Sequence, residues 1–370
     1  KETYICSNKV FRDILKNSGF TIRKLKNELI NRNIIINEKT LWGYKNRNAI
    51  PINIFKIFLE ITNSDKDKII SELQYIKSRK GKIIDISNIT LSEFMWLLGI
   101  IASDGDLRRQ SKIRSNRTKP YHTYKFRVCN TNKIILSKAE SLMKKIGLTT
   151  RRYKEDTIES NNTILGIIFN ILGLPLGRKS KTLKLSDDFF KLNNAAIEEF
   201  MAGHFDGDGN YNKKPCQIRI GSGSKEFAEQ FHSLLLRLGF LSKIIEIDKN
   251  ETRIIKGKRA IFTGNFYSVE IYRKIDVLKF LEMKGIVKAH NDGITYNFYK
   301  NKDPNFFEVN IKSIKRINKD KTFNLEIEDN RNYIAENIIV HNSGRTARTK
   351  PGKIIFLMTN DTRDIGYYYS

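Results

Sequence analysis

Hydrophobic residues recur at the helical period in several short stretches of residues 1–62. Ile22, Leu25 and Leu29 are one such set, and Asn37 is suited to cap the helix that follows. We therefore expect a small helical domain at this end of the chain.

From residue 91 the order of expected elements occurs twice. An apolar helix that ends in Asp-Gly is followed by alternating, strand-like residues and then by a helix that ends near a glycine. This order fills residues 91–190 and again residues 197–300. Repetition of one order of elements predicts a duplicated αβ unit with approximate twofold symmetry.

Two of the strand-like stretches alternate strictly between apolar and polar residues. They are residues 124–128 and 216–220, and this alternation places apolar side chains on one face of a sheet and polar ones on the other. A basic, amide-bearing face has the chemistry to lie along a DNA groove, although an ordinary solvated face gives the same pattern. The side chains expected to contact DNA are Lys125, Arg127, Gln217 and Arg219.

Composition favours a nucleic acid as the partner. The 370 residues include 67 Lys and Arg against 40 Asp and Glu, a formal net charge of +27, with 40% hydrophobic residues for core formation. The three cysteines form no CxxC pair, which fits a reducing compartment. No signal peptide or long apolar span occurs, so we expect a cytoplasmic protein without membrane association.

Two apolar helices end in Asp-Gly, within residues 97–105 and 201–209. Each carries two small residues four positions apart, which lie on one face and allow two helix backbones to approach closely. We expect the two helices to pack against each other at the centre of the duplicated unit. The small residues are Gly99 and Ser103 in one helix and Gly203 and Gly207 in the other.

The aspartate of each pair lies at the end of its helix, where the helix dipole disfavours negative charge. A divalent cation would reverse that penalty, so we expect Asp104 and Asp208 to share Mg²⁺, assisted by the exposed carbonyls at Gly105 and Gly209. Both glycines are expected in the left-handed conformation that ends helices. A single Asp-Gly sequence commonly ends a helix without any further role. Two of them in matching contexts indicate a metal site.

These paired motifs resemble the signature helices of the LAGLIDADG homing endonucleases. The resemblance implies that each repeat is an αββαββα unit whose antiparallel sheet binds DNA. It further implies Mg²⁺-dependent hydrolysis of double-stranded DNA at a long target site, and we expect a monomer. It also implies a basic residue near each aspartate, here Lys179 and Lys288. The first acidic position of the motif is Ala102 in one helix and Asp206 in the other. We interpret His204, at a usually apolar position, as a packed residue.

The segment that contains Lys39, Lys45 and Arg47 resembles a helix-turn-helix, which implies DNA contact. A plain three-helix bundle would give the same pattern, so both interpretations stay open at this point.

Residues 306–342 alternate as strands and are followed by Ser343. The sequence at this junction, His341-Asn342-Ser343, resembles the C-terminal half of an intein splicing domain. The asparagine amide can attack its own backbone carbonyl and break the next peptide bond, while the histidine polarises that carbonyl and the serine hydroxyl accepts the acyl group.

Two departures weaken this splicing hypothesis. Asn324 and Arg331 stand where aspartate and histidine are common, and nothing before residue 91 resembles an N-terminal splicing segment. We expect that segment to be missing or supplied by a separate fragment. The sequence after residue 342 resembles the arginine motif of superfamily 2 helicases, most like archaeal fork-DNA helicases, and would be a piece of host protein.

The sequence thus predicts an α+β protein with five parts. They are a helix-turn-helix-like domain (1–62), a linker (63–90), an endonuclease of two repeats (91–300), an all-β half of a splicing (Hint) domain (301–342) and a host fragment (343–370). The predicted function is that of an intein-encoded homing endonuclease. The alternative is a degenerate intein remnant that binds DNA and retains only C-terminal peptide cleavage.

Overall fold

The chain forms two compact units in a computed structural model. Unit 1 comprises Lys1–Lys179 and Glu199–Gly207, and unit 2 comprises Ser180–Glu198 and Asp208–Ser370. Among the helices that the structure describes, none is long and apolar enough to cross a membrane. The structure describes residues 3–6, 10–47, 49–64, 73, 75–78, 83–112, 121–248, 251–255, 258–262, 264–288, 306–308, 332–335, 338–341 and 355–357.

The N-terminal part of unit 1 contains the expected helices around one core. Leu25, Leu29, Leu41 and Phe58 are fully buried in it, and the side chain of Asn37 accepts a hydrogen bond from the first turn of its helix, as predicted. The helices are α1 (Val10–Ser18), α2 (Ile22–Asn31), α3 (Glu38–Arg47) and α4 (Ile52–Ile61).

A small antiparallel sheet accompanies these helices, which sequence reasoning did not predict. Its strand order is β2-β1-β3-β4, and two of its strands lie within residues 63–90, where we expected only a linker. Short strands without strict alternation carry little signal in a sequence, which explains the omission. The strands are β1 (Thr3–Cys6), β2 (Ala49–Pro51), β3 (Tyr75–Ser78) and β4 (Ile84–Asp85).

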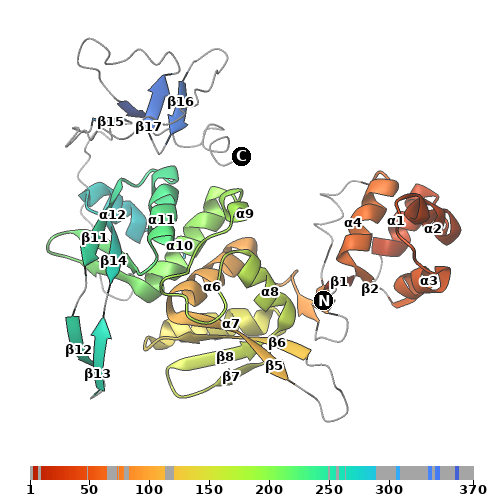
Figure 1. The fold of residues 1–370 in the computed structure, drawn as a ribbon, viewed down its shortest axis with the longest axis horizontal. Coiled ribbons are helices and arrows are strands. Elements are labelled where there is room, and N and C mark those ends of the chain that lie inside the picture. The colour runs from red at the N-terminus through yellow and green to blue at the C-terminus, as the bar shows by residue number, and fades with distance from the viewer. Residues whose placement is uncertain are drawn as a thin grey trace. The chain divides into compact units, whose positions relative to one another are not determined.

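The rest of unit 1 is a four-stranded antiparallel sheet of order β5-β6-β8-β7, covered on one face by α6, α7 and α8 (Figure 1). Phe126, Val128 and Ile158 point into the core and are fully buried. The elements are α6 (Leu91–Asp104), β5 (Gly105–Lys112), β6 (Tyr121–Cys129), α7 (Lys133–Lys145), β7 (Thr150–Arg152), β8 (Thr157–Asn161) and α8 (Thr163–Ile171).

The second repeat has the same order of elements; it lies in unit 2 except for Glu199–Gly207 of α10, which belong to unit 1. Its sheet pairs as β9-β10-β14-β11, which is the order of the first sheet, with a hairpin of β12 and β13 inserted before the last strand. The duplicated order expected from the sequence is therefore confirmed. The elements are α9 (Asp187–Phe190), α10 (Asn194–Asp208), β9 (Gly209–Asn212), β10 (Gln217–Ser222), α11 (Lys225–Arg237), β11 (Ser242–Asp248), β12 (Glu251–Ile255), β13 (Lys258–Phe262), β14 (Asn265–Ile271) and α12 (Lys274–Leu281).

Beyond residue 288, the described residues all lie in strands: β15 (Phe306–Glu308), β16 (Asn332–Ala335), β17 (Ile338–His341) and β18 (Ile355–Leu357). Strand β15 pairs with β18 across the expected boundary between the splicing segment and the host fragment. The junction residues Asn342 and Ser343, together with Asn324 and Arg331, lie outside the described residues.

Helix α6 packs closely against the part of α10 that belongs to unit 1, and glycine makes the contact sterically allowed. A Cβ atom on Gly99 would overlap the carbonyl oxygen of Phe200 and lie 2.8 Å from the amide nitrogen of His204. A Cβ atom on Gly203 would overlap the carbonyl oxygen of Trp96. The expected packing of two helices through their small residues is confirmed.

The glycine that follows each aspartate does not adopt the expected left-handed conformation. Gly105 is extended, with φ −115° and ψ −174°, and opens strand β5. A Cβ atom there would overlap the carbonyl oxygen of Arg127, so the close crossing of β6 is what requires glycine. Gly209 likewise opens a strand and is not among the glycines of positive φ.

We predict that Gly203→Ala destabilises the protein by about 3 kcal/mol, because backbone atoms of α6 would have to move to admit a methyl group. The measurement is the free energy of unfolding in urea. Gly43→Ala is the matched control, since a Cβ on that helical glycine meets nothing within 4 Å. It should be neutral or stabilising by up to about 1 kcal/mol. Equal stabilities of the two variants would contradict the packing.

Candidate active site

Asp104 is the last residue of α6, a helix fixed at both ends. At its start Thr90 and Glu93 form a reciprocal capping box. At its end, the carboxyl carbon of Asp104 lies 3.1 Å from the position that a Cβ on Gly207 would occupy. The close packing of the helices therefore holds this carboxylate against the last turn of α10.

Asn130 orients the Asp104 carboxylate, and sequence reasoning missed it. Its Nδ2 donates to Asp104 Oδ2 at 2.5 Å, while its Oδ1 accepts from the backbone nitrogen of Asn132 at 2.7 Å. Because the amide oxygen is held by a backbone N–H, the amide nitrogen faces the carboxylate. An asparagine after a strand predicts a turn, but the sequence alone does not show which side chain it reaches.

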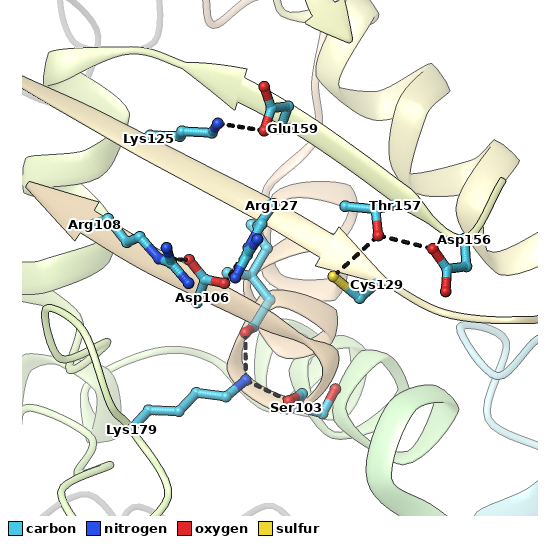
Figure 2. A network of polar contacts seen from close by, with 11 residues as sticks. Ser103, Asp106, Arg108, Lys125, Arg127, Cys129, Asp156, Thr157, Glu159 and Lys179 are labelled. Carbon is cyan, nitrogen blue, oxygen red and sulfur yellow. Dashed lines mark hydrogen bonds and ion pairs between the residues drawn. The ribbon is translucent and has the colours of Figure 1, made fainter. Parts of the chain in front are cut away.

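Lys179 lies at the C-terminal end of α6 (Figure 2). Its ammonium group donates to the carbonyl oxygen of Ile101 at 2.9 Å and to that of Ser103. Positive charge at this end of a helix is favourable. The loop before Lys179 is anchored by the backbone nitrogen of Gly177, which donates to the carbonyl oxygen of Leu107 on β5.

Unit 2 contains a comparable arrangement. The ammonium group of Lys288, which follows α12, donates to the carbonyl oxygen of Gly209 at 2.6 Å. Asp208 is the last residue of α10 and is exposed. Each lysine named from the sequence thus bonds to a backbone carbonyl at an Asp-Gly helix end of its own unit.

The donor set at these helix ends consists of carboxylate and carbonyl oxygens, which Mg²⁺ prefers. Among the described residues, no cluster of three or more His, Cys, Asp or Glu side chains could hold a metal ion. Mg²⁺ commonly binds through one or two carboxylates and completes its shell with water and phosphate oxygens, so the residues present fit this ion.

Asp206, at the first acidic position of the second Asp-Gly motif, is buried and bonds to the neighbouring helix. Asp206 is 1% exposed, and its Oδ2 accepts a hydrogen bond from Trp96 Nε1 at 3.0 Å. The ammonium group of Lys138 lies 4.0 Å from the centroid of the Trp96 ring. Burial lowers the pKa of Lys138, and the negative charge of Asp206 opposes that shift. This carboxylate therefore belongs to the packed helix interface.

His204 is packed in the same interface. It is 1% exposed, and its pKa is lowered to about 3, first by burial and then by the positive charge of Lys179. The imidazole is consequently neutral at physiological pH, in agreement with its interpretation as a packed residue.

On the polar face of the unit 1 sheet, the predicted DNA-contacting cations pair with acids (Figure 2). Lys125 pairs with Glu159, and Arg127 pairs with Asp106. Arg108 reaches the same Asp106 carboxylate at 2.9 Å. Lys125 and Arg127 keep 24% and 28% of their side-chain surface exposed, so the acids orient these cations without covering them.

In the unit 2 sheet, one buried carboxylate organises the polar face. Glu270 is 3% exposed, accepts a hydrogen bond from Gln217 Nε2 at 2.5 Å and forms an ion pair with Arg219 Nε at 3.1 Å. Gln217 is itself buried, so its amide bonds within the sheet and is not available to contact a DNA base, contrary to our expectation. Arg219 keeps 49% of its side chain exposed. The sequence did not indicate Glu270, because an acidic residue in an alternating strand is expected to point to solvent.

The remaining predicted residues lie outside these two sheets. Lys39 is exposed on α3, and Lys45 lies 4.9 Å above the ring of Trp42. Arg47 ends α3, and its side chain is outside the described part of the structure. His341 ends β17, opposite Asn332 in β16.

Comparison with known proteins gives partial matches. The chain is 29% identical over 166 residues to the probable translation initiation factor IF-2 of Thermococcus kodakarensis, covering 45% of this chain and 13% of that protein. It is 28% identical over 221 residues to the DNA-directed RNA polymerase subunit Rpo1C of Methanocaldococcus jannaschii, covering 59% and 23%. The chain therefore spans less than a quarter of the length of these relatives.

Among solved structures, the homing endonuclease I-DmoI in complex with DNA and Mn matches 53% of this chain and 98% of that one, with 19% identity and a TM-score of 0.38. Residues 195–285 match the family described as LAGLIDADG-like domain. This match extends from within α10 to just beyond α12.

Proposed function

We propose that this chain is a site-specific endonuclease that cuts double-stranded DNA with a divalent metal ion. The glycine contact between α6 and α10 is the observation that carries the proposal. It holds the Asp104 carboxylate beside Gly207, and Asp208 follows Gly207 directly in the chain. Mg²⁺ commonly binds through one or two carboxylates, so an aspartate at the end of each helix suits a shared ion.

In this proposal Asp104 and Asp208 bind the metal, and the backbone oxygens at Gly105 and Gly209 assist. Bound Mg²⁺ would lower the pKa of a water molecule and stabilise the leaving oxygen of the phosphodiester. Asn130 holds the Asp104 carboxylate in one orientation. Lys179 and Lys288 provide positive charge close to each aspartate, where the scissile phosphates would lie.

The polar faces of the two sheets supply the DNA contacts. Lys125, Arg127 and Arg219 are partly exposed and held in place by neighbouring carboxylates. Side chains that are already oriented lose less conformational entropy when they bind. The formal net charge of +27 adds attraction for the phosphate backbone that does not depend on sequence.

We also propose that the endonuclease belongs to an intein. The matching relatives have unrelated names, an initiation factor and an RNA polymerase subunit, and only a small share of each is matched. An element inserted into different host genes produces this pattern. His341 is the last residue of β17, where it pairs with Asn332 of β16, and it directly precedes Asn342, so we propose peptide cleavage after that asparagine. The helicase-like host fragment after residue 342 and a separate N-terminal splicing fragment belong to this proposal.

For the nuclease, we predict that Asp104→Asn and Asp208→Asn each lower the rate of DNA cleavage by about 1000-fold or more, because a weakened metal site forfeits several kcal/mol of transition-state stabilisation. The substrate is duplex DNA of the host gene without the insertion, assayed with Mg²⁺ or with EDTA. Asp187→Asn, an exposed acid on α9, is the control with the same charge change and should cut normally. Wild-type protein that binds this DNA without cutting it would favour the degenerate remnant.

For Asn130, we predict that Asn130→Ala raises the half-saturating Mg²⁺ concentration for cleavage by about tenfold, as loss of an outer-shell partner does at other metal sites. The rate at saturating Mg²⁺ should change much less. Asn88→Ala removes a comparable bond, from Asn88 Nδ2 to Asp85 Oδ2 at 2.8 Å, and should leave the Mg²⁺ dependence unchanged. An unchanged Mg²⁺ requirement in Asn130→Ala would exclude the positioning role.

For peptide cleavage, we predict that the purified chain slowly loses residues 343–370 and that Asn342→Ala prevents the loss, since alanine has no amide to attack the backbone carbonyl. Intact-mass spectrometry over time gives the result. A wild-type mass that never changes would refute autonomous cleavage and leave the nuclease proposal untouched.

A further inference from the structure

Helix α3 has an outer face that packs against nothing in the N-terminal core. Leu41 is fully buried and Tyr44 packs against the core, and these two residues define the inner side of the helix. Residues at positions 39, 42, 43 and 46 fall on the opposite side because of the helical period. We call this surface the α3 outer face; it consists of Lys39, Trp42, Gly43 and Asn46.

The α3 outer face carries side chains suited to a polar partner. Lys39 and Asn46 are exposed, and Trp42 keeps 43% of its surface exposed. Lys45, at the edge of this face, lies over the indole at 4.9 Å, which restrains both side chains. Water solvates an exposed indole ring poorly, whereas a nucleic acid can contact both the ring and the lysine that lies over it.

Gly43 gives an independent indication that something approaches this helix. Glycine inside a helix costs about 1 kcal/mol relative to alanine. At Gly99 and Gly203 the neighbouring helix backbone explains the glycine, but a Cβ on Gly43 would meet nothing within 4 Å. Nothing in the described structure therefore explains Gly43, whereas the close approach of an external partner would.

The charge around α3 favours an anionic partner. Helix α2 presents exposed Arg23 and Lys24 in its first turn, and α1 presents exposed Arg12 and Lys16. Basic residues outnumber acidic ones over residues 10–47. A helix of this kind fits the major groove of duplex DNA, which admits an α-helix, while the preceding helix contacts the phosphate backbone.

We propose that α3 is a second DNA-reading element, which enters the major groove of duplex DNA with Lys39, Trp42 and Asn46 while Gly43 allows the groove to approach the helix backbone. Asparagine pairs with the adenine edge and lysine with guanine, and the indole supplies apolar contact. This binding needs no divalent ion and no cleavage, so it stands or fails separately from the proposed nuclease.

Tryptophan fluorescence tests the contact, because the chain has two tryptophans and Trp96 is fully buried. A mixed-sequence DNA duplex is titrated into the full chain in EDTA. We expect the duplex to quench the fluorescence of the wild type and to leave that of Trp42→Phe unchanged. Absence of quenching in the wild type, or equal quenching in Trp42→Phe, would overturn the proposal.

Gly43→Ala separates DNA contact from stability. We expect the Kd for the duplex to weaken by about fivefold, equivalent to about 1 kcal/mol, while the free energy of unfolding stays equal or rises. Asn53→Ala, an exposed helical position on α4, is the matched control and should leave the Kd unchanged. An unchanged Kd in Gly43→Ala, a loss of its stability, or preferential binding of single-stranded DNA in competition would each contradict the proposal.

Discussion

The contact between the backbones of α6 and α10 determines where the candidate site residues of unit 1 lie. Gly99 and Gly203 allow it, since a methyl group at either position would overlap a backbone carbonyl oxygen of the other helix. Once the helices are this close, Asp104 lies against Gly207, and Trp96 can reach the buried carboxylate of Asp206. The same packing buries His204 and keeps its imidazole neutral.

The distribution of charge follows a second constraint, which is that a strongly basic protein must still fold. Asp106, Glu159 and Glu270 stand among the cations of the two polar sheet faces. Each reduces repulsion between neighbouring basic side chains and fixes their direction. The cations that remain partly exposed are therefore arranged before any partner arrives, at the expense of some attraction for phosphate.

The sequence predicted the features that depend on local pattern. Helical spacing and paired Asp-Gly ends located both central helices, their small residues predicted the packing, and alternation located β6 and β10. Features that depend on contacts between distant segments were not predictable. Asn130 reaches Asp104 only because the end of β6 lies beside the end of α6. Residue 105 must be glycine because a Cβ atom there would overlap the backbone of β6, not because a left-handed turn needs it.

The central claim is that the two helix-end aspartates act on one metal site, and a double-mutant cycle on metal affinity measures this directly. Mn²⁺ binding to the protein–DNA complex would be followed by electron paramagnetic resonance for the wild type, Asp104→Asn, Asp208→Asn and the double variant. One shared site predicts strong coupling, with each single variant losing nearly as much affinity as the double variant. Additive losses, or a single variant that binds Mn²⁺ as the wild type does, would contradict the account.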